Sequence, residues 1–175
     1  MVELLLARHD RTYAQEAGIE LADMPAPLFQ LLVLANLLSA RIGAGAAVAT
    51  ARELFAAGFR TPEAMRGASR PALLAALGRG GYRRYDERTA TMLHDGAQQL
   101  FQDDDGDLRR LRDACDGPGQ ILERLQDFPG IGPAGAAIFA REAQGVWPVL
   151  APFLDKKALS GAVRLGLPDE APRLA

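Results

Sequence analysis

The chain has 175 residues, of which 49% are hydrophobic and 24% charged, the proportions of a folded, soluble globular protein. Its net charge of -2 lacks the basic excess that is typical of nucleic-acid binders. The single cysteine, Cys115, excludes an internal disulfide, a Cys-ligated zinc site and a four-thiolate iron-sulfur cluster, so we expect it to be a packed residue. The two histidines, His9 and His94, lie far apart in the sequence, and we assign neither a role.

The first apolar segments of the chain do not predict a signal or a membrane span. Residues 1–10 lack the basic region and cleavage site of a secretory signal. The most apolar run, 27–40, is interrupted by Gln30, Asn36 and Ser39 and is shorter than the roughly 20 residues that a bilayer requires. We therefore expect a cytoplasmic protein.

Helical periodicity dominates the sequence, and we find no convincing strand. Pro25 and Pro27 open a buried helix with apolar residues at a spacing of three and four, and a second helix is predicted from Gly45 to Ala57. Six further helical segments follow, at 61–68, 70–77, 82–102, 106–115, 117–128 and 133–144, and a last one lies at 156–165. The sequence therefore predicts an all-α protein.

Gly130, Gly132 and Gly135 have the spacing of a dinucleotide-binding turn, and Asp155 follows at the distance of a ribose-binding acid. Such a turn must follow a buried strand, however, and the segment before Gly130 is helical. The interpretation that remains is a tight hairpin between two helices. Its glycines leave backbone amides uncovered beside a helix that starts at Pro133, which favours binding of a phosphate.

The segment LQDFPGIGPAGAAIFAREAQGVWP, at 125–148, resembles the helix-hairpin-helix of DNA glycosylases of the endonuclease III superfamily. LLVLANLLSARI, at 31–42, is similar to the family's second helix, and GYRRYDERTATML, at 81–93, to its Gly-x-Tyr helix start. FLDKKALSGAVRLGLP, at 153–168, resembles the segment with the catalytic Asp. The matches run in consistent order through most of the chain.

The resemblance implies a helical barrel at 27–147 that contains the helix-hairpin-helix at 121–145, and a reduced second lobe made of 1–26 and 148–175. It implies Asp155 as the catalytic carboxylate. The DNA contacts that it implies are Gly130, Ile131, Gly132, Ala134, Gly135, Arg41, Lys156 and Lys157. It also allows a monovalent cation at the hairpin carbonyls, whereas the cysteines of an iron-sulfur cluster are missing, and we expect no required cofactor or metal.

The sequence departs from the family at two places. Ala134 occupies the hairpin position at which lyase members carry a lysine, and Lys156 and Lys157 replace a Thr-His pair after Asp155. Because it lacks this lysine, the chain resembles the monofunctional members of the family, such as the adenine glycosylases and the methyl-CpG-binding-domain thymine glycosylase. The latter also resembles this chain at Gly135 and Arg41.

Each candidate residue also has a simpler interpretation. Asp155 can stabilise the developing positive charge on a sugar, or it can cap the helix that follows. Arg41 can fill the gap that a flipped base leaves, or it can be solvated at a helix end. Lys156 and Lys157 can contact phosphate or solvent, or one can supply a lyase amine. The segment at 79–88, with arginines and Tyr82 and Tyr85, is a DNA contact or a solvated helix start.

We therefore expect an all-α, glycosylase-like fold and a monomeric, nucleoid-associated base-excision repair protein. Its partner would be double-stranded DNA that contains a damaged or mismatched base, and its activity would be that of a monofunctional DNA glycosylase. The alternatives are a non-catalytic helix-hairpin-helix DNA-binding protein, a bifunctional glycosylase/lyase that uses Lys156 or Lys157, and a helical interaction module without DNA binding.

Overall fold

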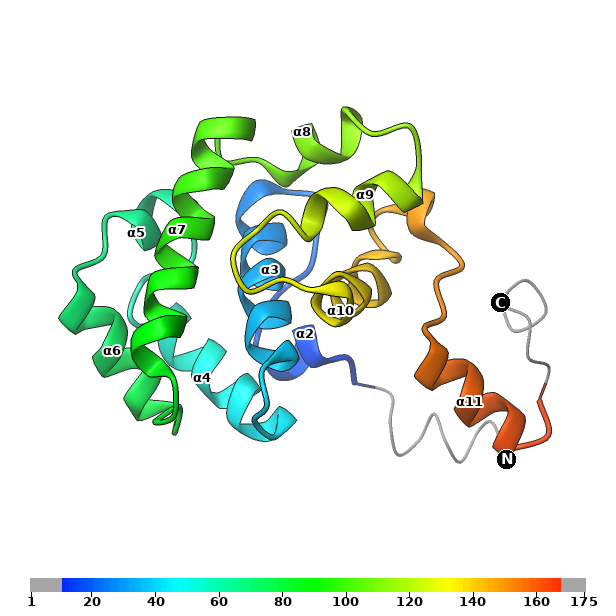
Figure 1. The fold of residues 1–175 in the computed structure, drawn as a ribbon, viewed down its shortest axis with the longest axis horizontal. Coiled ribbons are helices and arrows are strands. Elements are labelled where there is room, and N and C mark those ends of the chain that lie inside the picture. The colour runs from blue at the N-terminus through cyan, green and yellow to red at the C-terminus, as the bar shows by residue number, and fades with distance from the viewer. Residues whose placement is uncertain (1–10, 168–175) are drawn as a thin grey trace.

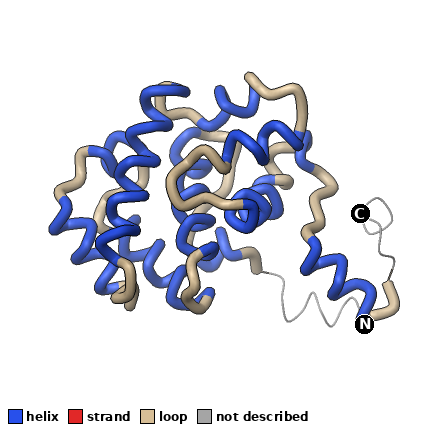
Figure 2. The backbone as a smooth tube through the Cα atoms, viewed as in Figure 1, coloured by secondary structure: helices blue, strands red, loops and turns tan. Residues whose placement is uncertain are grey.

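The computed structural model describes residues 11–167, and every regular element within that range is a helix (Figures 1 and 2). This confirms the all-α class for the described part of the chain. The helices are α2 (Tyr13–Glu16), α3 (Pro25–Ser39), α4 (Ala44–Ala56), α5 (Pro62–Arg66), α6 (Arg70–Arg79), α7 (Asp86–Asp104), α8 (Leu108–Asp113), α9 (Pro118–Leu125), α10 (Pro133–Ala143), the short 3₁₀ helix η1 (Pro148–Leu150) and α11 (Lys156–Arg164).

Local signals set most of the helix ends. The side chains of Thr61 and Ser69 accept hydrogen bonds from the backbone amides of Ala64 and Ala72, so each caps a helix with proline in its first turn, as the sequence predicts. Asp107 caps α8 in the same way, by accepting from the amide of Arg109.

The start of α7 differs from the sequence prediction. We expected a helix from Tyr82, but α7 begins at Asp86, because Gly81 and Tyr85 both have positive φ, of 86° and 65°. Tyr82 instead turns into the core, where its hydroxyl oxygen accepts a 2.9 Å hydrogen bond from Thr89. The burial of this aromatic ring outweighs the helical propensity of the segment.

The hydrophobic core is built around α3, which is drawn in blue at the centre of Figure 1. Every residue from Leu31 to Leu37 is buried, including the polar Asn36. A helix that is apolar on all sides is stable only when neighbours surround it, and α3 packs against α4, α8 and α10. The second helix of the predicted helix-hairpin-helix, α10, therefore lies directly against the central helix.

The two ends of the described chain differ in how they join this core. Ala14 of α2 and Ala17, directly after this helix, belong to the same core as α3. Ala162 is the only buried residue of α11, which lies at the edge of the molecule (Figure 1). The division into a barrel and a second lobe stays a prediction, and parts of that lobe, together with His9, lie outside the described residues. None of the described helices combines the length and apolar character needed to span a membrane.

Candidate nucleic-acid interface

The hairpin between α9 and α10 is a tight turn with both of its large side chains inside the protein. The carbonyl of Phe128 accepts a 3.0 Å hydrogen bond from the amide of Ile131, and Gly130 between them has a φ of 82°. Phe128 and Ile131 are buried. Because the hydrophobic side chains anchor the turn from below, its backbone forms the outer surface.

Two polar side chains of α3 hold the hairpin from beneath. The Asn36 amide donates a 2.9 Å hydrogen bond to the carbonyl of Pro129, and the Ser39 hydroxyl lies 3.4 Å from the carbonyl of Gly130. The Ser39 hydroxyl also donates to the carbonyl of Asn36 at 2.8 Å. These contacts join parts of the chain that are more than 90 residues apart, so the position of the hairpin depends on α3.

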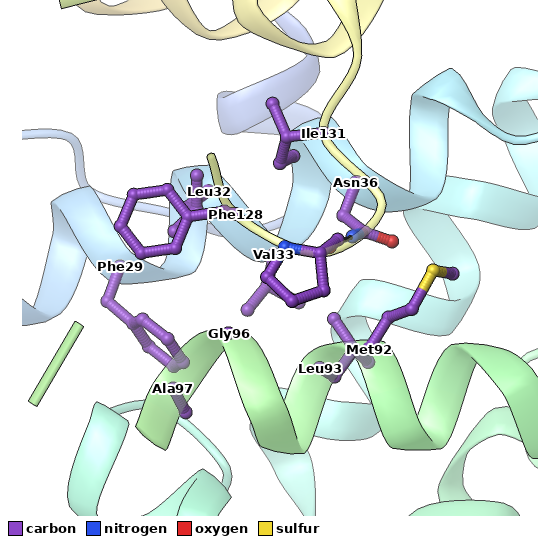
Figure 3. A pocket seen from close by; sticks show the side chains of 11 residues that line it. Phe29, Leu32, Val33, Asn36, Met92, Leu93, Gly96, Ala97, Phe128 and Ile131 are labelled. Carbon is purple, nitrogen blue, oxygen red and sulfur yellow. Dashed lines mark hydrogen bonds between the residues drawn. The ribbon is translucent and has the colours of Figure 1, made fainter. Parts of the chain in front are cut away.

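Gly130 fits because it has no side chain. A Cβ atom added there would lie 2.5 Å from Nδ2 of Asn36 and 2.9 Å from Sδ of Met92, a residue of α7. Figure 3 shows Asn36 directed at the hairpin and Met92 approaching from α7, above a small apolar pocket lined by α3, α7 and the turn. Both the positive φ and the close approach therefore require glycine at this position.

The amides at the start of α10 remain without protein partners. Among residues 11–167, the amides of Gly132, Ala134 and Gly135 donate no hydrogen bond to a protein acceptor, although Gly135 itself is buried. Gly132 is half-buried and Ala134 is exposed, and the helix dipole places partial positive charge at this end. The geometry can therefore hold an anion at the outer face of the hairpin.

Arg41 follows the end of α3, and it is Ser39 in that end that lies near the start of α10. Arg41 is exposed and follows Ser39 by two residues, and a Cβ added at Gly135 would lie 3.5 Å from Cβ of Ser39. The end of α3 and the first turn of α10 are thus in contact. The DNA-contacting role of Arg41 stays a prediction.

Asp155 is placed differently from the hairpin residues. One carboxylate oxygen accepts a 2.8 Å hydrogen bond from the amide of Ala158, so Asp155 is the N-cap of α11, and the other accepts a 3.0 Å hydrogen bond from Nη1 of Arg141. Arg141 stands seven residues after Ala134, about 10 Å along the same helix. Asp155 thus lies beside the last turn of α10, and its side chain forms no hydrogen bond or ion pair with the hairpin residues 128–132.

The lysines that follow Asp155 point to solvent. Lys156 and Lys157 form the first turn of α11, and both are exposed. Within residues 11–167 neither makes an ion pair with an acidic side chain. Their exposure is compatible with phosphate or solvent contact, and their proposed roles stay predictions.

The basic-aromatic segment at 79–88 is only partly available for a contact. Tyr82 is buried, so it cannot touch a ligand at the surface, and this part of the expected contact is wrong. Arg79 pairs with Glu53 at 2.8 Å. Tyr85 remains 57% exposed, with the Arg84 guanidinium 5.1 Å from the centre of its ring.

Comparison with known proteins does not assign the chain to a family. No protein-family model matches the chain, and no curated protein matches its sequence. The interpretation of the site therefore rests on its geometry and on the motifs themselves.

The described residues offer no grouped metal ligands: nowhere within 11–167 do three His, Cys, Asp or Glu side chains come together as a metal ion requires. The carbonyls of Pro129 and Gly130, which could contribute to a monovalent cation site, already face the Asn36 amide and the Ser39 hydroxyl. A cation at the hairpin stays a prediction.

Three residues that hold the site were not identified from the sequence: Asn36, Arg141 and Gln144, whose side-chain amide forms hydrogen bonds with the backbone of Phe153. Asn36 had a visible signal, since it is a polar residue in the middle of a helix that is otherwise apolar. Arg141, in the last turn of α10, and Gln144, directly after this helix, had no such signal, because a charged or amide side chain at the end of a helix is usually solvated.

Proposed function

We propose that the protein is a helix-hairpin-helix DNA-binding protein of the DNA glycosylase type, which removes a damaged or mismatched base from double-stranded DNA. The observation that carries the proposal is the hairpin: Gly130 has no space for a side chain, Asn36 holds the turn, and the amides at the start of α10 lack protein partners. This arrangement is suited to a backbone phosphate and is independent of base sequence.

The binding would be electrostatic and local. Because the whole chain has a net charge of -2, affinity for DNA must come from a few positions rather than from a general basic surface. The amides of Gly132 and Ala134 would contact one phosphate, and the exposed Arg41, which follows the end of α3, would supply a positive charge. Binding of intact DNA would therefore be weak, and it would fall with salt only modestly, because few phosphates are contacted.

The excision step would need a carboxylate near the sugar of a flipped nucleotide. Breaking an N-glycosidic bond creates positive charge on the sugar, and an ionised carboxylate stabilises that charge and can orient or deprotonate the attacking water. Asp155 is fixed by two hydrogen bonds and is held at the end of a helix, so its orientation is defined. Arg41 would occupy the space left by the base, at an unstacking cost that is smallest for damaged pairs.

A second candidate function is DNA binding without catalysis. The observation that favours it is the placement of Asp155, whose two carboxylate oxygens already accept hydrogen bonds and which lies beside the last turn of α10 rather than the first. Ala134 also leaves the hairpin without an amine. In this case the hairpin would bind DNA and no base would be released.

The experiment that separates the two uses duplexes with uracil, thymine opposite guanine, hypoxanthine, 8-oxoguanine pairs, an alkylated base or an abasic site. Each duplex is incubated with the protein or with Asp155→Asn and is analysed with and without alkali. A monofunctional glycosylase gives alkali-dependent cleavage of at least one base-containing duplex, and the variant abolishes it. Binding of all duplexes without cleavage supports the second candidate. No binding at low salt contradicts both.

A further inference from the structure

We propose that Arg141 is a positioning residue that sets the orientation of the Asp155 carboxylate, and that the last turn of α10 thereby connects the hairpin helix to the excision chemistry. This inference rests on the proposed function, since it assigns a role in the reaction that Asp155 would perform. The observation behind it is the ion pair between Nη1 of Arg141 and Oδ2 of Asp155, at 3.0 Å.

The segment that carries Asp155 has few other attachments. Between η1 and α11 the backbone at 151–155 forms no helix, and α11 has one buried residue, Ala162. A carboxylate on such a segment would have no defined distance from the rest of the site. Contacts from another element must therefore hold it.

Those contacts come from two side chains, that of Arg141 in α10 and that of Gln144 directly after this helix. Gln144 accepts a 2.9 Å hydrogen bond from the amide of Phe153 and donates a 3.1 Å hydrogen bond to its carbonyl. Arg141, one turn earlier, holds the Asp155 carboxylate two residues further along the segment. The segment is thus attached to α10 at two points, one through backbone atoms and one through the carboxylate itself.

The Arg141 side chain is itself held in place. It is 30% exposed, its guanidinium lies 5.9 Å from the centre of the Tyr13 ring, and the Asp155 side chain is 18% exposed. The adjacent Glu142 accepts a 3.0 Å hydrogen bond from the amide of Ala14 in α2. A pair that is partly shielded and supported on both sides is more specific than a solvated surface pair, whose geometry is usually variable.

This geometry fixes both oxygens of the carboxylate. Oδ1 accepts from the amide of Ala158, and Oδ2 from Arg141, so rotation about the side-chain torsions is restricted. A carboxylate keeps further lone pairs when two are used, so a water or a sugar can still approach it. Arg141 would therefore act on the rate of excision through Asp155, because a misplacement of about 1 Å can change a rate by about 100-fold.

The test compares Arg141→Gln and Arg141→Lys with the unaltered protein, on whichever duplex of the panel the protein cleaves. Single-turnover excision rates are measured at saturating protein, and the Kd for the same duplex is measured separately. We expect Arg141→Gln to lower the rate about 10- to 100-fold with the Kd unchanged within twofold. Arg141→Lys, which keeps a cationic donor, should recover part of the rate.

Arg110→Gln is the matched control, because it also removes an arginine from an ion pair, in this case an exposed pair with Asp105 at the C-terminal end of α7. This variant should leave the excision rate and the Kd unchanged. If Arg141→Gln weakens DNA binding and lowers Tm without changing the saturated rate, Arg141 is structural and the inference is wrong. An unchanged rate in Arg141→Gln also contradicts it while the proposed function stands. If the unaltered protein cleaves no duplex, the proposed glycosylase activity is wrong and this inference with it, and DNA binding without cleavage then leaves only the second candidate function.

Discussion

The side-chain amide of Asn36, in the middle of the central helix α3, donates a 2.9 Å hydrogen bond to the carbonyl of Pro129 in the hairpin. Asn36 is 6% exposed, so this is a polar group kept inside an apolar core. Buried polar groups are retained where they have a partner, and here the partner is the one turn for which we propose contact with DNA. The interior of α3 and the surface of the hairpin are therefore one structural unit.

Replacing Asn36 by Ala should weaken DNA binding while the protein remains folded. The substitution leaves the Pro129 carbonyl without its donor, which costs about 1 kcal/mol of unfolding free energy and loosens the turn. We expect the Kd for a duplex to rise about tenfold, measured by fluorescence anisotropy at fixed salt. Gln30→Ala, near the other end of α3, is the control and should bind normally. An unchanged Kd in Asn36→Ala would mean that the position of the hairpin does not affect DNA binding.

Gly130→Ala should be more damaging than Gly132→Ala. At Gly130 the added Cβ would meet Asn36 at 2.5 Å and the residue would keep a φ of 82°, whereas at Gly132 nothing lies within 4 Å and φ is -97°. A non-glycine residue in the left-handed region costs about 1 kcal/mol before the clash is counted. Thermal unfolding should show a lower Tm for Gly130→Ala and a nearly unchanged Tm for Gly132→Ala. Equal Tm values would contradict the packing described for the turn.

The sequence predicted the helices well where local chemistry determines them. Pro25, the Thr61 and Ser69 caps and Pro133 fixed helix starts that the structure confirms. The start of α7 was missed because burial of Tyr82, a tertiary effect, is not visible in a local pattern. The Arg141–Asp155 pair was missed for the same reason, since the direction of each side chain depends on how the segment at 151–155 returns to α10.

Acid should destabilise the protein in part through Asp23. Burial alone would raise its pKa, but hydrogen bonds from Arg112 and Trp147 and the charges of Arg112 and Arg109 outweigh burial and hold the pKa below its ordinary value. A carboxyl whose folded pKa is lowered stabilises the protein above its unfolded pKa of about 3.9, and this stabilisation is lost as pH falls through the lower value.

Asp23→Asn should therefore lower Tm at pH 7, with a difference from the unaltered protein that shrinks below about pH 4. Asp23→Ala should cost more, about 1–3 kcal/mol, because Nε1 of the fully buried Trp147 loses its 2.9 Å acceptor. Trp147 is the only tryptophan, so its fluorescence reports unfolding directly. A Tm difference that is constant from pH 7 to pH 2 would contradict the role assigned to this carboxylate.

Asp104 should have the opposite effect on stability, because its ionised carboxylate should destabilise the folded protein at neutral pH. Its side chain is 8% exposed at the C-terminal end of α7, and burial is the main reason that its pKa is raised, although Arg124 at 4.0 Å opposes the shift. A carboxyl with a raised folded pKa destabilises the folded state at neutral pH, and the helix dipole adds to this. We expect Asp104→Asn to stabilise the protein by about 0.5–1 kcal/mol at pH 7 in urea unfolding, and by less at pH 4. Destabilisation at pH 7 would show that the pair with Arg124 dominates.

No covalent adduct with DNA should form through Lys156 or Lys157. A lyase lysine forms a Schiff base with the sugar, and the hairpin position that carries it in lyases is Ala134 here. Lys156 and Lys157 are exposed on the first turn of α11, after the Asp155 cap and away from the start of α10. Borohydride treatment of the protein with abasic duplex should give no trapped complex on a denaturing gel. A trapped complex that disappears in Lys156→Ala or Lys157→Ala would instead identify the amine, and it would mean that α11 approaches the sugar together with Asp155.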